Sequence, residues 1–405
     1  MRILVVSQYF HPENFRINDL ALGLKDLGHD VTVLTGIPNY PQGKFFDGYG
    51  YFKPREELWN GIKIIHCLLA PRKSSGFLHL AFNYISFALF ASIAVLTRLR
   101  GKFDVIFVFQ VSPITVGIPA IVAKYVKKAP IFFWVLDLWP ESVLATTNIK
   151  SKLVVALLSR LTRSIYGHCD RVLVQSKGFF AHAKKMGVED CRLRFFPNWA
   201  EDFYVPAQKD MQLNASLPTG FRIMFAGNIG MAQDFDAILK AAFTLKEQVH
   251  IQWVIVGDGK QRAYVEHQIH LLGLQNTVHL IGQKPVQMMP AYFASADALL
   301  VSLKNEEIFA STIPGKIPSY LACAKPILGM LNGEGANIIN EAGAGLTCHA
   351  GDSHGLVEIV LKISELSSHQ LACLGNNGLR YYQQTFDRAS LFKKLEEEMS
   401  TLATK

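Results

Sequence analysis

Polar and ionisable side chains gather directly after the first apolar run of the sequence, at 3–10. This turn holds His11, Glu13, Asn14 and Arg16 and precedes a stretch with helical periodicity. The amino end of a helix attracts anions, and a planar guanidinium can hold two phosphate oxygens at once. These residue types favour an anion-binding turn. The alternative is a solvated loop that only caps the helix.

A second chemical candidate is Asp137, which ends the apolar run at 131–137 and is followed by Leu-Trp-Pro-Glu-Ser. Proline at the expected start of a helix, directly after a strand, places the carboxylate at the carboxyl end of a sheet. The alternative is that Asp137 caps the helix and Trp139 lies in the core. The unusual hexapeptide favours the functional interpretation.

The second half of the chain repeats a glycine-bearing turn after two apolar runs, at 221–230 and 251–259. The turn residues are Gly227, Asn228, Gly230, Gly257 and Asp258. Backbone amides in such turns can cradle a phosphate, although tight turns also need glycine for their own geometry. The spacing is not GxGxxG and no acidic partner follows, so a dinucleotide cofactor is disfavoured.

Lys316 lies near the start of another expected helix and is a candidate for a diphosphate contact, with an exposed lysine as the alternative. No metal site is predicted. Asp234 and Asp236 have DxD spacing but fall in the first turn of a helix, where acids favour the dipole. His267 and His270 share a helical face without an evident third ligand.

The elements expected to position these residues form two series of short apolar strands separated by helical patterns. The first series is 3–10, 31–36, 104–109, 131–137 and 171–176. The second is 221–230, 251–259, 278–282, 296–303 and 325–330. Unbroken apolar strands alternating with helices predict parallel sheets covered on both faces.

A polar, proline-bearing segment at 196–220 separates the two series and is read as a linker. The prediction is therefore an α/β fold of two doubly wound, Rossmann-like domains, over 1–200 and 215–378, that bind ligands in a cleft. An amphipathic helix over 379–401 could return to pack on the first domain.

Charge is distributed unevenly along the 405 residues. The chain has a net charge of +8, but residues 1–200 carry +12 and the remainder −4. A basic half attracts a polyanion or an anionic membrane surface, and no nucleic-acid-binding motif is recognisable. The six cysteines are scattered without a CxxC pair and no secretory signal is seen, so a cytoplasmic location is expected.

The stretch 77–96 has 20 residues without a formal charge and is flanked by lysine and arginine. Its length suits a membrane span, but a span would divide the strands of one sheet between two sides of a bilayer. Two interpretations remain: a helix that covers the first domain, and an interfacial helix lying in the membrane plane. The second makes Leu80 and Phe87 candidates for contact with lipid.

Together these motifs resemble the GT-B glycosyltransferases of family 4, and most closely the bacterial O-antigen and capsule enzymes of the N-acetyl-L-fucosamine transferase type. The resemblance covers nearly the whole chain. It rests on SQYFHPENFRINDLALGL (7–24), GHDVTVLTGIPNYPQGK (28–44), DLWPES (137–142), PNW (197–199), AGNIGMAQ (226–233), VGDG (256–259), ADALLVSLK (296–304), IPGKIPSYLACAKPIL (313–328) and NGEGA (332–336).

The resemblance implies a retaining, metal-independent transferase without a cofactor, in which the C-terminal domain binds a UDP-sugar and the N-terminal domain a polyprenyl-diphosphate-linked acceptor. The sugar would be an N-acetylated deoxyhexose or a hexosamine, and the enzyme would lie at the inner face of the cytoplasmic membrane. The residues implied at the catalytic centre are Asp137, Glu13 and Asn14, with His11 and Arg16 near the acceptor or its phosphate. Those implied at the donor are Gly227, Asn228, Gly230, Gly257, Asp258, Lys316, Ser319 and Glu334.

Some positions depart from the family pattern. Two glutamates eight residues apart are usual, and Ser311 and Ser319 stand in their place, so the ribose contact is expected to be weakened or to move, with Glu334 as the candidate. Gln110 follows a strand where many relatives have histidine. Two alternatives remain open: a sugar-nucleotide 2-epimerase of GT-B architecture, and a non-catalytic scaffold of a polysaccharide assembly complex.

Overall fold

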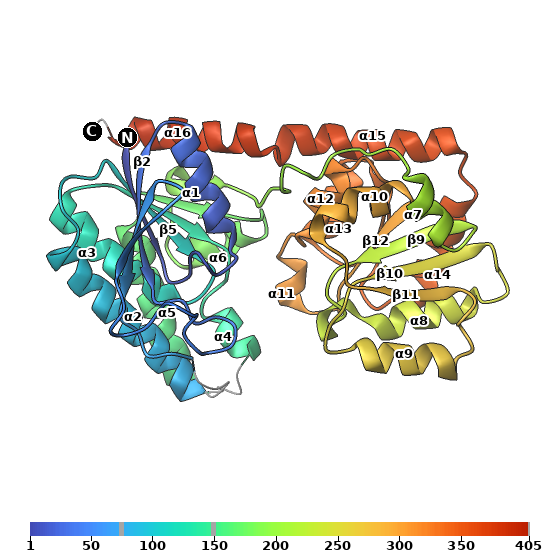
Figure 1. Ribbon diagram of the computed structural model, residues 1–405, viewed down its shortest axis with the longest axis horizontal. Coiled ribbons are helices and arrows are strands. Elements are labelled where there is room, and N and C mark those ends of the chain that lie inside the picture. Colours follow the sequence, from blue (N-terminus) through green and yellow to red (C-terminus); the bar gives the residue numbers. More distant parts are fainter. Residues whose placement is uncertain (73–76, 147–150, 404–405) are drawn as a thin grey trace. The chain divides into compact units, whose positions relative to one another are not determined.

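A computed structural model describes residues 1–72, 77–146 and 151–403 (Figure 1). The chain divides into two compact units. Unit 1 comprises Met1–Pro197 together with Leu391–Lys405, and unit 2 comprises Asn198–Ser390. Each unit is a sheet with helices on its faces, as the alternation of apolar strands and helical patterns predicts.

The sheet of unit 1 has the strand order β3-β4-β2-β1-β5-β6-β7-β8. Its strands are β1 (Arg2–Ser7), β2 (Asp30–Gly36), β3 (Glu56–Trp59), β4 (Ile62–Cys67), β5 (Val105–Gln110), β6 (Ile131–Val135), β7 (Arg171–Val174) and β8 (Leu193–Phe195). All neighbours are parallel except β3 and β4, which form an antiparallel hairpin at one edge. The central strands β1, β5 and β6 are almost wholly buried, which explains their continuous apolar sequences.

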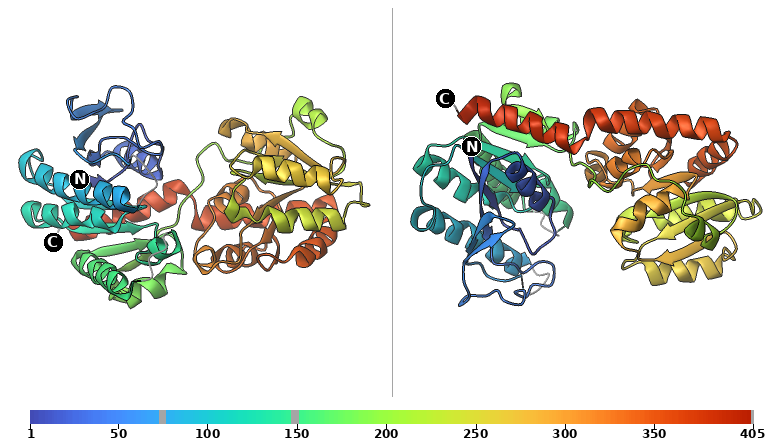
Figure 2. Two further views of the ribbon diagram at one scale, coloured as in Figure 1. Left: turned by 90° about the horizontal axis from the view of Figure 1, so that it is seen from below. Right: turned by 45° about the horizontal axis from the view of Figure 1, so that its top comes forward.

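The helices of unit 1 lie on both faces of this sheet (Figure 2). They are α1 (Arg16–Asp26), α2 (Phe77–Thr97), α3 (Gly117–Lys127), α4 (Glu141–Thr146), α5 (Lys152–His168), α6 (Phe179–Lys185) and α16 (Arg388–Ala403), with short 3₁₀ turns at Ile114–Val116 and Asp190–Arg192. The predicted strand at 131–137 ends at Val135. Asp137 therefore lies two residues beyond it, in the turn that leads to α4.

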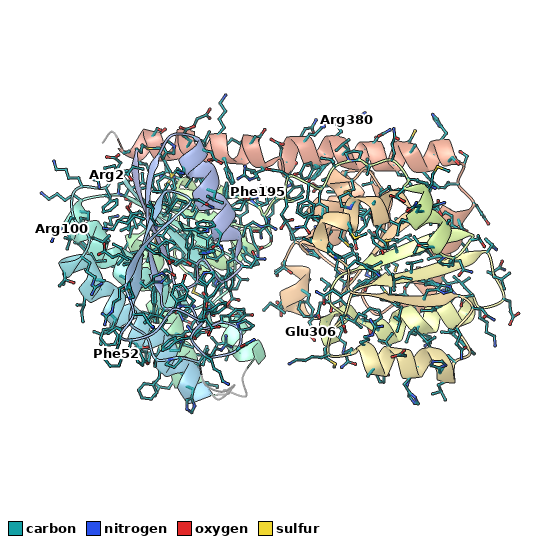
Figure 3. All side chains as sticks on the ribbon, in the orientation of Figure 1. Arg2, Phe52, Arg100, Phe195, Glu306 and Arg380 are labelled. Carbon is teal, nitrogen blue, oxygen red and sulfur yellow. The ribbon has the colours of Figure 1, made fainter. Side chains whose placement is uncertain are left out.

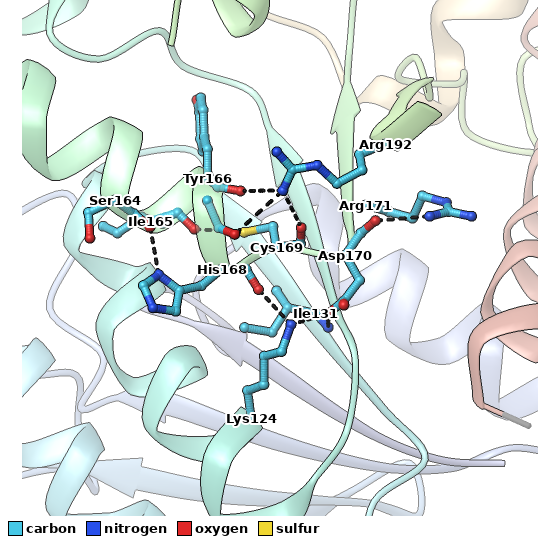
Figure 4. A network of polar contacts seen from close by, with 11 residues as sticks. Lys124, Ile131, Ser164, Ile165, Tyr166, His168, Cys169, Asp170, Arg171 and Arg192 are labelled. Atoms are coloured by element: carbon cyan, nitrogen blue, oxygen red, sulfur yellow. Dashed lines mark hydrogen bonds and ion pairs between the residues drawn. The ribbon is translucent and has the colours of Figure 1, made fainter. Parts of the chain in front are cut away.

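A polar network fixes the amino ends of β6 and β7 to the helices beside them (Figure 4). Asp170 Oδ2 accepts a hydrogen bond from the backbone N–H of Ile131 at 2.8 Å and pairs with Lys124 Nζ at 2.6 Å. The guanidinium of Arg192 donates to the carbonyl oxygens of Tyr166 and Cys169. The last carbonyl oxygens of a helix have no partner within it, so Arg192 satisfies carbonyls at the end of α5. The contacts of Asp170 hold the amino ends of β6 and β7 in place.

Helix α2 covers the sheet with one face and leaves an apolar face exposed. Phe87, Ala91 and Val95 are fully buried, whereas 68% of Phe82 and 56% of Leu89 is exposed. The segment His79–Thr97 is long and apolar enough to cross a membrane, but α2 packs on the helical layer of unit 1, as the covering-helix interpretation predicts. The choice of Leu80 and Phe87 as lipid contacts was wrong, because Leu80 packs against the core and Phe87 lies within it.

Unit 2 contains a six-stranded, fully parallel sheet in the order β11-β10-β9-β12-β13-β14. Its strands are β9 (Phe221–Ala226), β10 (Ile251–Val256), β11 (Val278–Gly282), β12 (Ala298–Ser302), β13 (Ile327–Met330) and β14 (Gly345–Cys348). Its helices are α7 (Met211–Ser216), α8 (Phe235–Thr244), α9 (Arg262–Leu271), α10 (Met289–Ala294), α11 (Glu307–Ala310), α12 (Lys316–Ala322), α13 (Glu334–Glu341), α14 (Ser353–Ser364) and α15 (Ser368–Thr385), with 3₁₀ turns at Met231–Gln233 and Val286–Met288.

Two segments differ from the sequence-based expectation. The segment 196–220 is not entirely a linker, because it contains α7, which Arg222 holds through hydrogen bonds to Asn214. The helix expected over 379–401 is two helices, since α15 ends at Thr385 and α16 begins at Arg388. In unit 1, α16 packs on the edge of the sheet, where Glu398 forms ion pairs with Arg171 and Arg194.

Candidate active site

In unit 2 the glycine turns after β9 and β10 meet each other and the side chain of Lys316. A Cβ atom built on Gly227 would lie 2.8 Å from Lys316 Cε, and one on Gly257 only 1.9 Å from the carbonyl oxygen of Gly227. Both glycines have positive φ angles, 134° and 151°, which other residues rarely adopt. These two positions therefore require glycine for close approach as well as for conformation.

The neighbouring turn residues complete the same cluster. The backbone N–H of Ile229 donates to the carbonyl oxygen of Asp258 at 2.8 Å, which joins the two turns. The side chain of Asn228 lies against Gly259 and Gly230, and the carboxylate of Asp258 is exposed and accepts from the N–H of Gly259. The sequence-predicted residues Gly227, Asn228, Gly230, Gly257, Asp258 and Lys316 are thus brought together at the carboxyl edge of the sheet.

Lys316 brings a cation into this cluster without a charged partner. Its Nζ lies 3.4 Å from the centroid of the Phe225 ring, a cation–π contact. Within residues 1–72, 77–146 and 151–403, no carboxylate pairs with it. The side chain keeps some exposure, but burial of the ammonium group lowers its pKa to about 7. An anion bound beside Nζ would restore the charged form.

Ser319 and Glu334 stand on either side of the same helix start. Ser319 lies one turn along α12 from Lys316, is buried, and donates its hydroxyl to the carbonyl oxygen of Gly315. Glu334 is in the first turn of α13, directly after Gly333, whose backbone packs against the carbonyl oxygen of Ala310. Glu334 is partly exposed. The Ser319 hydroxyl is thus satisfied within its helix, while Glu334 begins α13, whose next residue, Gly335, packs against Pro314 and Ile317 at the start of α12.

In unit 1, Glu13 is buried and holds two loops together. Its Oε1 accepts hydrogen bonds from the backbone N–H groups of Asn39 and Tyr40, at 2.8 and 2.7 Å. Burial raises the pKa of Glu13 to about 7, against the effect of these hydrogen bonds. The structure therefore places Glu13 as a support of the loop after β2. Asn14, by contrast, is exposed at the same turn.

Aromatic rings line the turns around Glu13. Tyr9 stacks on Phe15 with ring centroids 5.0 Å apart, and Tyr40 packs on both rings. His11 points away from this group and stacks on Trp59 of the edge hairpin at 4.7 Å, where burial lowers its pKa. Arg16 is the first residue of α1 and is partly exposed. His11 and Arg16 thus flank the turn on different sides.

Asp137 lies at the same carboxyl edge of the sheet. Its Oδ2 accepts from Trp139 Nε1 at 3.2 Å, and hydrogen bonding from Ser112 and Ser142 also stabilises the charged form. Burial outweighs these contacts and raises the pKa of Asp137 to about 6. Tyr84 of α2 connects this group to the Tyr9 ring, since its hydroxyl lies 3.3 Å from Ser112 Oγ and its pKa responds to both Asp137 and Tyr9.

Sequence reasoning missed several members of the unit 1 site. They are Gln8, Arg72, Tyr84 and Ser112. Gln8 directly follows β1 and Ser112 lies two residues beyond β5, so the rule that ligands bind beyond carboxyl ends could have found them. Tyr84 and Arg72 come from α2 and the segment before it, and only the fold brings them to this edge.

Comparison with known families places both units among glycosyltransferases. Residues 14–199 match the family described as Glycosyl transferase 4-like domain, and residues 220–365 match Glycosyl transferases group 1. The two matches fall one in each unit and together span most of the chain. The motifs on which the family 4 resemblance rests lie within or beside these ranges.

Curated relatives agree with this assignment. The chain is 30% identical over 266 residues to the probable glycosyltransferase WbjE of Pseudomonas aeruginosa, an alignment that spans 63% of this chain and 65% of that protein. It is 26% identical over 338 residues to WcaI of Escherichia coli K12, a putative colanic acid biosynthesis glycosyl transferase, over 80% of this chain and 81% of the relative.

Solved structures share the fold at low sequence identity. Sucrose-phosphate synthase from Thermosynechococcus elongatus superposes with a TM-score of 0.73 at 14% identity, over 99% of both chains. Anabaena Alr3699/HepE, crystallised in complex with UDP, gives 0.69 at 15% identity over 99% of this chain and 100% of the other. These neighbours support the prediction of two parallel-sheet α/β units of the GT-B type.

Proposed function

The chain belongs to the GT-B glycosyltransferases of family 4, and from that premise we propose that it transfers a sugar from a UDP-sugar to a polyprenyl-diphosphate-linked acceptor in bacterial polysaccharide synthesis. The transferred sugar is an N-acetylated deoxyhexose or a hexosamine, and its anomeric configuration is retained. The observation that carries the proposal is the unpaired ammonium of Lys316 beside the glycine turns of unit 2.

The ammonium of Lys316 beside the glycine turns is suited to assist the departure of the nucleotide. When the bond between the sugar and the diphosphate breaks, negative charge grows on the diphosphate oxygens. A cation in a partly dehydrated setting stabilises that charge more strongly than water does, and it is in position before the reaction begins. The turns around Gly227 and Gly257 allow the diphosphate to approach the backbone, because no side chain intervenes. HepE, with UDP and with UDP-glucose, offers a structural parallel for nucleotide binding by this fold.

Unit 1 is suited to hold the acceptor in this proposal. Asp137 is buried enough to have a raised pKa yet keeps part of its surface exposed, so its carboxylate can orient a sugar hydroxyl. In a retaining reaction by front-face attack, the leaving diphosphate takes the acceptor proton. Asp137 then serves to position the acceptor rather than to remove its proton. Asn14, exposed at the neighbouring turn, is a second candidate for a hydroxyl contact.

An apolar, basic surface of unit 1 fits a location at the inner face of the membrane. The outward residues of α2 are Phe82, Ile85, Leu89, Ile93 and Leu96, and the adjacent α3 exposes Tyr125 and Val126. Neither helix contains an acidic residue. Arg98, Arg100 and Lys102 follow α2. Apolar side chains bordered by cations favour binding to anionic lipid.

The proposal is tested by incubating the purified chain with a panel of UDP-sugars and a polyprenyl-diphosphate-linked saccharide, without added metal. We expect acceptor-dependent release of UDP and a lengthened lipid-linked product with the donor's anomeric configuration. Interconversion of UDP-N-acetylglucosamine without acceptor would instead indicate an epimerase. Tight UDP-sugar binding without turnover on any lipid-linked acceptor would indicate a scaffold.

A further inference from the structure

Arg72 places an unassigned cation at the carboxyl edge of the unit 1 sheet. It lies five residues after β4, and its backbone N–H donates to Asn39 Oδ1 at 3.2 Å, which ties it to the loop after β2. Its guanidinium carbon lies 5.9 Å from the centroid of the Tyr40 ring. The contact with Asn39 and the ring together direct the side chain toward the group of aromatic residues that contains Tyr9.

The neighbours recorded for this guanidinium are three tyrosines, Tyr40, Tyr9 and Tyr84. Burial raises the pKa of both Tyr9 and Tyr84, and the positive charge of Arg72 opposes that rise in each case. In the part of the chain that the structure describes, no carboxylate forms an ion pair with Arg72. The residue is partly exposed, so a ligand can reach it. An arginine that stays charged and has no carboxylate partner among the described residues suits an anionic ligand.

Two buried amides beneath the same edge have polar atoms without hydrogen-bonding partners in the described part of the chain. Gln8 follows β1 and Gln110 ends β5, and the register of these strands pairs Ser7 with Phe109. Gln8 and Gln110 are therefore adjacent. Gln8 Nε2 donates to Asn83 Oδ1 of α2 at 2.6 Å, but Gln8 Oε1 and both polar atoms of Gln110 are unsatisfied.

A buried amide destabilises the folded state unless a partner satisfies its hydrogen bonds. Only 2% of Gln8 and none of Gln110 is exposed, so bulk water does not supply the missing hydrogen bonds. A buried unsatisfied polar group costs about 1–3 kcal/mol. The amides adjoin Asn83, and the next residue of α2, Tyr84, faces Arg72. Asn83 also donates its Nδ2 to the carbonyl oxygen of Ala70, two residues before Arg72, so Asn83 links the amide of Gln8 to the segment that carries the cation.

Helix α2 anchors the segment that carries Arg72. The backbone N–H of Ala70 donates to Ser86 Oγ, and its carbonyl oxygen accepts from Asn83 Nδ2. The segment that ends at Arg72 is therefore held against the second and third turns of α2.

We propose that Arg72 binds a phosphate of the lipid-linked acceptor, at an edge where the buried amides of Gln8 and Gln110 keep polar atoms without a hydrogen-bonding partner among the described residues. The inference rests on the proposed function, because it takes the acceptor to be a diphosphate-linked saccharide. The ligand chemistry is a phosphate ester, and its two sources are the prenyl diphosphate of the acceptor and a phospholipid headgroup. We assign the prenyl diphosphate, since Arg72 lies at the edge that also holds Asp137.

A binding experiment tests this inference without requiring turnover. Geranyl diphosphate, a soluble prenyl diphosphate, is titrated into the full chain by calorimetry with UDP at saturation, so that Lys316 is already occupied. We expect Arg72→Gln to weaken binding at least tenfold and Arg72→Lys to weaken it less, because lysine keeps the charge but loses the planar fork. Geraniol, which lacks phosphate, should not bind the wild type.

The matched control is Arg380→Gln, which removes the same charge from an exposed arginine of α15 in unit 2 (Figure 3). It should leave geranyl diphosphate binding unchanged. Equal affinities of Arg72→Gln and wild type would overturn the inference, as would equal losses in both variants. Co-sedimentation with phosphatidylglycerol vesicles separates the two sources. A loss confined to vesicle binding in Arg72→Gln would assign the residue to headgroups and contradict the proposal.

Gln110→Met provides a second and independent variant, because methionine keeps the volume and removes the amide. If the amide serves the acceptor, the KM for a polyprenyl-diphosphate-linked saccharide rises several-fold while the melting temperature stays the same or increases. An unchanged KM would remove Gln110 from the site. Failure of the wild type to use any lipid-linked acceptor would refute the proposed function. The calorimetric result for Arg72 would then still decide whether this edge binds a prenyl diphosphate.

Discussion

Donor binding by this protein should depend on pH through Lys316. Burial holds the pKa of its ammonium group at about 7 in the free protein, with no ionisable neighbour contributing to the shift. A diphosphate beside Nζ favours the charged form and moves the pKa back toward its usual range. Binding therefore takes up a proton. Affinity should be highest below the free-state pKa and should fall as the pH rises through it.

The size of the effect follows from the fraction of protein that is competent to bind. With a pKa of about 7, roughly nine in ten ammonium groups are charged at about pH 6 and roughly one in ten at about pH 8. The apparent dissociation constant scales inversely with this fraction, so it should rise about tenfold over that interval. A nucleotide sugar is the proper probe, because both of its phosphates stay ionised throughout.

Isothermal titration calorimetry in buffers of different ionisation enthalpy measures both the affinity and the proton uptake. Lys316→Arg should abolish the pH dependence, since a guanidinium stays charged. Lys316→Met should weaken binding at about pH 6 by roughly ten- to a hundredfold, the value of a charge-assisted hydrogen bond. Lys325→Met is the matched control. Burial also lowers the pKa of Lys325, to about 8, but this residue precedes β13 at the opposite edge of the sheet.

A pH-independent affinity in the wild type would refute the reasoning, because it would mean that Lys316 does not meet the diphosphate. An unaltered pH profile in Lys316→Met would refute it equally. If the pH dependence of affinity were lost in Lys325→Met but kept in Lys316→Met, the proton taken up on binding would belong to Lys325 rather than to Lys316.

Four further outcomes are expected. Gly257→Ala should abolish UDP-sugar binding in calorimetry, because its Cβ would meet the carbonyl oxygen of Gly227, whereas Gly273→Ala, at a positive φ with open space, should leave binding intact. Glu13→Ala should lower the free energy of unfolding by about 1–3 kcal/mol in urea titrations by stranding two backbone N–H groups, and Glu13→Gln should cost much less. Turnover should fall as the pH drops through about 6, where Asp137 takes up a proton, and Asp137→Asn should be slow throughout; a wild-type rate in that variant would remove Asp137 from the site. Phe82→Glu with Leu89→Glu should reduce co-sedimentation with anionic vesicles more than tenfold, while Leu271→Glu, at an equally exposed leucine of unit 2, should not.

Strands buried on both faces were predictable from the sequence, and edge strands were not. In β1, β5 and β6 nearly every residue is buried, so each strand reads as a continuous apolar run. Strand β3 alternates exposed and half-buried residues in Glu-Glu-Leu-Trp, and β8 has only three residues. Neither has enough apolar character to stand out from a loop.

The break between α15 and α16 had a local signal that apolar periodicity concealed. Asp387 Oδ2 accepts from the backbone N–H of Ser390, which is the hydrogen bond of a helix N-cap. An aspartate three residues before a serine, in the middle of a helical pattern, therefore marks the start of a new helix. The apolar spacing continues across the junction because Phe386 and Leu391 are both buried, so spacing alone predicted one helix.

The orientation of α2 could not be inferred from its sequence, because apolar residues surround the helix on all sides. Polar side chains usually face water, yet Asn83 and Ser86 face inward. Asn83 Nδ2 donates to the carbonyl oxygen of Ala70 and Ser86 Oγ accepts from the N–H of Ala70. The hydrogen bonds that these side chains form with the backbone of Ala70 outweigh the usual preference of polar side chains for water. The same orientation of α2 places Tyr84 at the unit 1 site, which its sequence did not indicate.

The donor cluster was predictable because it depends only on neighbouring parallel strands. β9 and β10 are adjacent, so the turns that follow them must meet, and glycine supplied the signal for both. The unit 1 site draws on α2 and on the segment that ends at Arg72, whose partners are set by packing far along the chain. Residues of that kind have no sequence spacing that reveals them.

The most direct test of the central claim is a crystal structure of the chain with a UDP-sugar bound. The account predicts a diphosphate oxygen within hydrogen-bonding distance of Lys316 Nζ, about 2.7–3.2 Å, and backbone N–H groups of the turn at 227–230 directed toward the same phosphate. A nucleotide bound elsewhere, or a diphosphate that leaves the Lys316 ammonium without contact, would contradict it.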